Sequence, residues 1–319
     1  MKQFFLFIVL MRAIAAIIIT NSHYTGVYPT DLIANGGLLG DVLFFSISGF
    51  CLASPRDNFG KWYLKRVIRV YTPSWVMTIV YIILGAYILT NLQDVFDFFI
   101  WPTHWHFVAS IILLYIPLFF VSKYIEMNKR NFLRLTGLIL FIQIILYFTV
   151  YDYSFYHIDT VREPMIEFLF FQSMLLGLHF RWKAENKSNN YRISLVKIGI
   201  VIFFTVLYFM SKMLFVKLPE IAPLQLINPI VLWGLLYVLF ELFMSIDSLL
   251  IRLEKSFLWK CISFLSNRTL EIYLVQYVII AQCKIGPFPI NWIILTSLII
   301  LSASILHWGS QKIIKYIQI

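Results

Sequence analysis

The chain has 319 residues, of which 60% are hydrophobic and only 13% are charged. A water-soluble domain carries about 25% charged residues, so this composition excludes an ordinary soluble globule and favours a membrane protein. The formal net charge of +10 does not indicate a nucleic-acid partner, because the cations lie in short segments between apolar runs, as in membrane-protein loops.

Ten apolar segments of membrane-spanning length follow one another along the chain. About twenty apolar residues cross the hydrocarbon core as a helix, and these runs are apolar on every face, unlike the alternating strands of a barrel. The predicted spans are 3–21, 37–54, 74–90, 105–121, 133–151, 165–180, 193–210, 225–245, 269–283 and 290–309. We therefore predict an all-α integral membrane fold, a polytopic bundle of about ten transmembrane helices that forms a single domain over residues 1–319.

Loops rich in lysine and arginine alternate along the chain with loops that have few of them. About 21 of them lie in or beside one set of loops and about four in the other set. Cytoplasmic loops carry the excess of positive charge, so the pattern predicts that both termini lie in the cytoplasm. The expected location is the cell (inner) membrane, with the surrounding lipid as a constant partner.

The first span carries a cation at its centre. Arg12 there costs at least ~2.5–3.5 kcal/mol on insertion scales, and such a residue normally faces the bundle interior or a wet cavity. His23 follows eleven residues later, which places it on nearly the same helix face, about 16 Å along the axis. The alternative is an arginine that extends to the cytoplasmic interface and an ordinary histidine at a loop end, and spacing alone does not choose between them.

The second span reads Gly40-Asp41-Val42-Leu43-Phe44-Phe45-Ser46-Ile47-Ser48-Gly49-Phe50. Ser48 and Gly49 are small enough for close helix packing, which taken alone is the better explanation for them. Asp41 is either a charge favoured by the helix dipole or a partner for His23.

Basic residues gather before the third span, in Lys61-Trp62-Tyr63-Leu64-Lys65-Arg66-Val67-Ile68-Arg69-Val70-Tyr71-Thr72-Pro73. On a helix Arg66 and Arg69 are neighbours, with Lys65 close by, and arginine forks suit phosphate groups. The alternative is a basic cytoplasmic loop of the kind that topology and anionic lipid favour.

The remaining titratable residues carry no recognisable motif. His104 and His106 flank Trp105 and point to different helix faces, so no metal site is expected there. Glu167 and Glu241 either line a cavity or sit at helix ends. Three further histidines look isolated in the sequence: His157, His179 and His307.

Together these segments resemble the membrane-bound acyltransferase-3 family, whose members transfer acyl groups, usually acetyl, to sugars. The closest similarities are Arg12-x10-His23, Phe44-Phe45-x-x-Ser48-Gly49-Phe50, and Arg66-x-x-Arg69 ahead of Pro73. Trp105-His106-Phe107 with Tyr115 and Pro117 is similar less closely. Ser266 to Gln276 resembles a late family segment that ends Tyr-Leu-x-His, but this chain has Gln276 in place of the histidine, so no proton-transfer role is carried over there.

The resemblance implies an O-acyltransferase that uses cytosolic acyl-CoA, with acetyl-CoA the expected donor, and no metal. Its acceptor would be a hydroxyl of an envelope or exported glycan or of a lipid-linked precursor. In this interpretation His23 is the general base, since histidine titrates in the useful range, and Asp41 orients it. Arg12 holds the donor or stabilises the thioester oxyanion. The donor-binding residues implied are Lys65, Arg66, Arg69 and Ser48.

Two other functions compete with acyl transfer. A transporter or flippase for a glycan or lipid-linked intermediate would have inverted repeats and broken helices at matched positions, and neither is visible in the sequence. A passive membrane scaffold leaves the central Arg12 unexplained.

Overall fold

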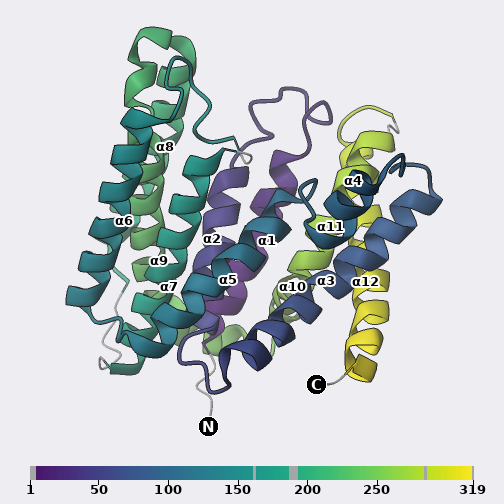
Figure 1. Cartoon of the computed structure of the whole chain (residues 1–319), viewed down its shortest axis with the longest axis horizontal. Helices are drawn as coiled ribbons and strands as arrows, with labels where there is room; N and C mark the ends of the chain where they lie inside the picture. Colours follow the sequence, from purple (N-terminus) through teal and green to yellow (C-terminus); the bar gives the residue numbers. More distant parts are fainter. Residues whose placement is uncertain (1–4, 161–162, 187–192, 284–285, 318–319) are drawn as a thin grey trace. The chain divides into compact units, whose positions relative to one another are not determined.

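The computed structural model of the chain describes residues 5–160, 163–186, 193–283 and 286–317. These residues form helices and no strand (Figure 1), which confirms the all-α prediction. The helices are α1 (Leu6–Ser22), α2 (Gly37–Cys51), α3 (Phe59–Ile83), α4 (Leu92–Val95), η1 (Phe96–Ile100), α5 (His106–Tyr124), α6 (Lys129–Thr149), α7 (Pro164–Asn186), α8 (Leu195–Lys217), η2 (Pro219–Leu224), α9 (Ile227–Leu253), α10 (Phe257–Ser266), α11 (Thr269–Gln282) and α12 (Ile290–Ile317).

Among the described residues, five helices are long and apolar enough to cross a membrane: α5, α6, α8, α9 and α12. Shorter apolar helices accompany them: α1, α2, α10 and α11. Several long apolar helices of this kind indicate a multi-pass membrane protein. The number of ten spans and the cytoplasmic position of both termini stay predictions.

The predicted start of the third span is wrong. Helix α3 begins at Phe59, where the Asn58 side chain accepts a hydrogen bond from the Lys61 backbone N–H at 3.0 Å and caps the helix. Pro73 lies inside the helix, which ends at Ile83 before Gly85 adopts a positive φ. Hydropathy located only the apolar part of α3, because its first three turns are cationic. The same bias placed a loop where the short helix α10 stands.

The described residues divide into two compact units. The first comprises the described parts of Met1–Met11, Asp41–Pro55 and Pro117–Lys260. Within it α8 and α9 form a hairpin through η2, and α7 packs against both α6 and α9. The Phe7 backbone N–H donates to Asp247 Oδ1 at 2.8 Å, which ties the start of α1 to α9. Glu241 pairs with Lys183, so this acidic residue of α9 is accounted for by an ion pair within the unit.

Two glycines let α2 and α7 touch within the first unit. A Cβ on Gly49 would lie 2.0 Å from the Met174 carbonyl oxygen, and one on Gly177 would lie 1.9 Å from the Ser46 carbonyl oxygen. No side chain fits at such distances, so each glycine faces the backbone of the opposite helix. The packing interpretation of the Ser48-Gly49 pair is thereby supported for Gly49, while its partner Gly177 carried no sequence signal.

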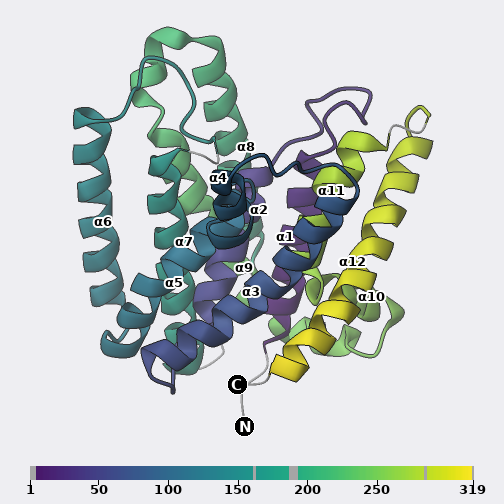
Figure 2. The same cartoon turned by 45° about the vertical axis from the view of Figure 1, so that its right-hand side comes forward.

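The second unit comprises the described parts of Arg12–Gly40, Arg56–Ile116 and Cys261–Ile319. Helices α3, α11 and α12 pack against one another, as both views show (Figure 1 and Figure 2). The Tyr81 hydroxyl of α3 donates to the Leu274 carbonyl of α11 at 2.7 Å. The Tyr24 hydroxyl bonds to Thr296 Oγ1 of α12 at 2.8 Å. These contacts join the segment after α1 to the three-helix core of this unit.

Candidate functional site

The seven predicted site residues are not evenly distributed. Five belong to the second unit: Arg12, His23, Lys65, Arg66 and Arg69. The other two, Asp41 and Ser48, belong to the first unit. The second unit therefore holds the predicted base and all the predicted cations.

His23 follows the last residue of α1, and its ring is held by the end of that helix. Its backbone N–H donates to the Thr20 carbonyl at 3.1 Å. Its Nδ1 lies 2.8 Å from the Ile19 carbonyl oxygen. Because a carbonyl oxygen can only accept, the bond places the imidazole proton on Nδ1 and leaves the lone pair on Nε2. Burial lowers the pKa of His23 below its ordinary value, partly opposed by the bond to Ile19, so the neutral ring is favoured.

Gln276 of α11 is the side chain that reaches His23 from a distant part of the sequence. Its Nε2 lies 3.4 Å from His23 Nδ1, and the neighbouring Tyr277 ring meets the imidazole edge-on at 6.0 Å between centroids. Gln276 Oε1 is buried and has no hydrogen-bond partner among the described residues. Rotating the amide by 180° exchanges its oxygen and nitrogen and turns Oε1 toward the Nδ1–H, which donates mainly to the Ile19 carbonyl. The sequence flagged Gln276 only as a departure from the family pattern.

Two glycines at the start of α2 allow that helix to approach the last turns of α1, just before His23. A Cβ on Gly37 would lie 2.6 Å from Ser22 Oγ. A Cβ on Gly40 would lie 2.5 Å from Ile19 Cγ1 and 3.1 Å from the Ala15 carbonyl oxygen. A side chain at Gly40 would displace Ile19, whose carbonyl fixes the histidine tautomer, so this close approach supports the position of His23.

Arg12 lies near the middle of α1 and is half-buried. Eleven residues separate it from His23, about 16 Å along the axis. This spacing places the two residues on nearly the same helix face, about three turns apart.

The basic residues of α3 are positioned by aromatic contacts. The Tyr63 hydroxyl donates to the Ile112 carbonyl of α5 at 3.2 Å, and the Trp62 ring meets Tyr115 edge-on at 5.9 Å. Arg66 lies over the Trp62 ring, with 5.5 Å from Cζ to the centroid.

Lys65 and Arg69 face outward from the same helix. Lys65 Nζ lies 2.8 Å from Asp57 Oδ2, and each side chain is about one-third exposed. The hydrogen bond from Lys65 holds the pKa of Asp57 below its usual range. Arg69 is exposed. The three cations thus lie on a helix, in the first turns of α3, and not in the basic loop that was the alternative.

Asp41 and Ser48 lie on α2. Asp41 is buried in its second turn, and Ser48 is half-buried beside Gly49. Orientation of His23 by Asp41 and donor binding by Ser48 remain predictions. The contact that holds the His23 ring through Nδ1 comes from the Ile19 carbonyl.

One histidine that looked isolated in the sequence has a charged partner. His307 Nδ1 of α12 lies 2.7 Å from Glu271 Oε1 of α11, and Glu271 is buried. A carboxylate inside an apolar helix needs such a partner, so Glu271 was itself the signal that the sequence offered. Among the described residues, no cluster of three or more metal-binding side chains is present.

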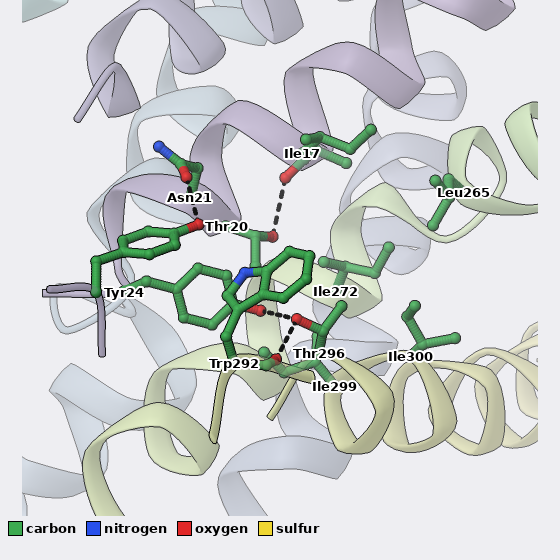
Figure 3. A pocket seen from close by; sticks show the side chains of 12 residues that line it. Ile17, Thr20, Asn21, Tyr24, Leu265, Ile272, Trp292, Thr296, Ile299 and Ile300 are labelled. Atoms are coloured by element: carbon green, nitrogen blue, oxygen red, sulfur yellow. Dashed lines mark hydrogen bonds between the residues drawn. The ribbon is translucent and has the colours of Figure 1, made fainter. Parts of the chain in front are cut away.

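An apolar cleft of about 190 Å³ begins beside His23. Tyr24, the next residue, lines it, as does Thr20, whose carbonyl accepts the His23 N–H. Figure 3 shows its polar side chains, among them Asn21 and Trp292, gathered on one side and its aliphatic side chains on the other.

Comparison with known protein families indicates the type of reaction. The acyltransferase domain model of the acyltransferase 3 family matches residues 5–308. No curated protein and no solved structure matches the chain. The family match covers nearly the whole chain and includes Arg12, His23 and the basic face of α3, and membership implies acyl transfer. The chain therefore belongs to the acyltransferase 3 family, as its sequence motifs predicted.

Proposed function

We propose that the protein is a membrane O-acyltransferase of the cell (inner) membrane. It takes an acyl group, with acetyl the expected one, from cytosolic acyl-CoA to a hydroxyl of an envelope or exported glycan or its lipid-linked precursor. Family membership supports acyl transfer. The observation that carries the mechanism is the bond between His23 Nδ1 and the Ile19 carbonyl.

The fixed tautomer gives His23 the role of general base. With the proton on Nδ1, Nε2 has a lone pair that can take the proton of an acceptor hydroxyl, and the lowered pKa keeps that lone pair available at neutral pH. The hydroxyl oxygen then forms a bond to the thioester carbonyl carbon, and the carbon–sulfur bond breaks. The imidazolium returns its proton to the leaving thiolate, which departs as free CoA thiol.

The donor needs cations for its phosphates, and the first turns of α3 offer three. Arginine forks bind phosphate through charge-assisted bonds. Arg66 is held over Trp62 and Arg69 is exposed, so the pair presents one half-buried and one accessible fork. Lys65 adds a third charge, which a phosphate would have to share with Asp57.

Of the two roles predicted for Arg12, a separation of about 16 Å from His23 along α1 favours holding the donor over stabilising an oxyanion. We assign Arg12 to holding the donor along α1. Asp41 would then support the histidine only indirectly, through its position on α2.

The test is acceptor-dependent acyl transfer in a closed system. Purified protein is placed in liposomes with acetyl-CoA labelled in the acetyl group on one side and the total envelope glycan fraction of the producing cell on the other. We expect label in the glycan together with an equal amount of free thiol. Glycan that crosses the bilayer without any thiol release would instead establish the transporter alternative.

A further inference from the structure

The cleft beside His23 is long enough for an extended alkyl chain. Along α12 its lining runs from Trp292 to Ile300, eight residue steps or about 12 Å. With a volume of about 190 Å³, the cleft is elongated, and an extended chain fits that shape. Since a carbon–carbon bond advances such a chain by roughly 1.3 Å, the cleft has length for about nine carbons.

The cleft is polar at one end and aliphatic at the other. Near His23 the Tyr28 hydroxyl donates to Asn21 Oδ1 at 2.8 Å, and the Tyr24 hydroxyl bonds to Thr296. Farther along, the lining is aliphatic and includes Ile17, Ile272 and Ile300 (Figure 3). A ligand that matches this gradient has a polar group at the His23 end and an apolar tail.

Charge distinguishes between the ligands whose tails could enter the cleft. All twelve side chains that line the cleft are uncharged. A polyprenyl-phosphate glycan carries phosphate directly on its tail, and a buried anion without a cation is costly. An acyl thioester is neutral around its carbonyl, because the phosphates of CoA lie at the far end of a long arm. The uncharged lining therefore favours the acyl group of the donor.

The cleft lies close to the position proposed for the thioester carbonyl carbon. On α11, Ile272 lines the cleft one turn before Gln276, which contacts His23. A thioester carbonyl placed for attack by a hydroxyl bound to His23 has its alkyl chain within about one helical turn, or about 5.4 Å, of the cleft. An acetyl group ends before reaching the cleft, whereas a chain of four or more carbons enters it.

We propose that this cleft is an acyl-chain site and that the protein accepts donors with acyl groups of up to about twelve carbons. The proposal rests on the proposed function, because it takes acyl-CoA to be the donor. A chain in the cleft replaces water or lipid against Ile272 and Ile299, both of which are buried. Selection among donors is then by chain length, with acetyl the smallest donor bound.

The test measures binding of acetyl-, butyryl-, hexanoyl- and octanoyl-CoA to the purified full chain by calorimetry. Each methylene that enters the cleft should tighten binding up to about fourfold, equivalent to ~0.8 kcal/mol, and hexanoyl-CoA should bind at least about tenfold more tightly than acetyl-CoA. Ile300→Trp and Ile17→Trp fill the cleft from two walls and should remove this gain while acetyl-CoA still binds. Leu301→Trp is the matched control, because Leu301 is exposed on α12 and does not line the cleft.

The outcomes separate the two proposals. Equal binding of all four donors by the unaltered protein would overturn the acyl-chain site and leave acyl transfer intact. A chain-length gain that persists in both cleft variants, or disappears in Leu301→Trp as well, would place the chain in the detergent or elsewhere on the protein and would also overturn it. Failure to bind any acyl-CoA would refute the proposed function itself.

Discussion

Replacing Gln276 by glutamate changes the charge beside the proposed base without changing side-chain length. In the unaltered protein burial lowers the pKa of His23 below 6.5, so the base stays neutral and acyl transfer stays constant down to about that pH. A carboxylate near His23 favours the imidazolium. Gln276→Glu should therefore raise the pKa of His23 and move the acid limb of the activity profile to higher pH.

The contact distance sets the size of the shift. At 3.4 Å, a unit charge pair is worth about 1.2 kcal/mol with the dielectric constant of water and about 5 kcal/mol with an effective value of about 20. One pKa unit corresponds to about 1.36 kcal/mol, so we expect the midpoint of the acid limb to rise by about one to four units. The measurement is kcat/KM for label transfer to the glycan fraction between about pH 5 and 9.

Two variants control for other effects of the substitution. Gln282→Glu adds the same charge to the exposed end of α11 and should leave the acid limb in place. Gln276→Leu removes the amide without adding charge, so activity should fall with no upward shift in pH dependence. An acid limb in Gln276→Glu at the same pH as in the unaltered protein would refute the assignment of His23 as the titrating base.

Three further predictions follow from other parts of the chain. Arg66→Ala and Arg69→Ala should each weaken the apparent affinity for acyl-CoA about tenfold or more, since a charge-assisted bond is worth ~1.5–3 kcal/mol. Titration of the donor measures this affinity. Unchanged affinity in both variants would mean that the basic residues of α3 serve only membrane topology. Gly49→Ala should lower the melting temperature, because its Cβ would lie 2.0 Å from the Met174 carbonyl oxygen and overpacking costs ~1–3 kcal/mol, whereas Gly137→Ala, with nothing within 4 Å, should not lower it; equal melting temperatures would contradict the contact between α2 and α7. Reporter fusions after residues 56, 127 and 254 should report cytoplasm and those after 30, 88 and 221 the opposite side, and two successive fusions on one side would break the ten-span topology.

Local sequence patterns were enough for the helices and for the residues on them. The apolar runs predicted an all-α membrane fold, because each helix must satisfy its own backbone hydrogen bonds in lipid. Hydropathy failed where a helix leaves the hydrocarbon, as in the cationic first turns of α3, which the Asn58 cap begins. The sequence placed Arg12 within α1 and His23 at its end for the same local reason.

A single sequence did not predict the contacts between segments that are far apart in the chain. Gln276 and His23 are 253 residues apart, and no periodicity links them. Of the two glycines at the contact between α2 and α7, only Gly49 belongs to a sequence motif, and Gly177 does not. The pairing of His307 with Glu271 follows only from the rule that a buried carboxylate needs a partner, and that rule does not name the partner.

The most direct test of the central claim is the turnover of His23→Ala together with its donor binding. If His23 takes the proton of the acceptor hydroxyl, turnover should fall by roughly 10²–10⁴-fold, the usual contribution of a general base. Acyl-CoA should still bind with unchanged affinity, because the cations assigned to the donor lie on α3 and, for Arg12, about three turns before His23 on α1. Near-normal acyl transfer by His23→Ala, at matched amounts of membrane-inserted protein, would contradict the mechanism.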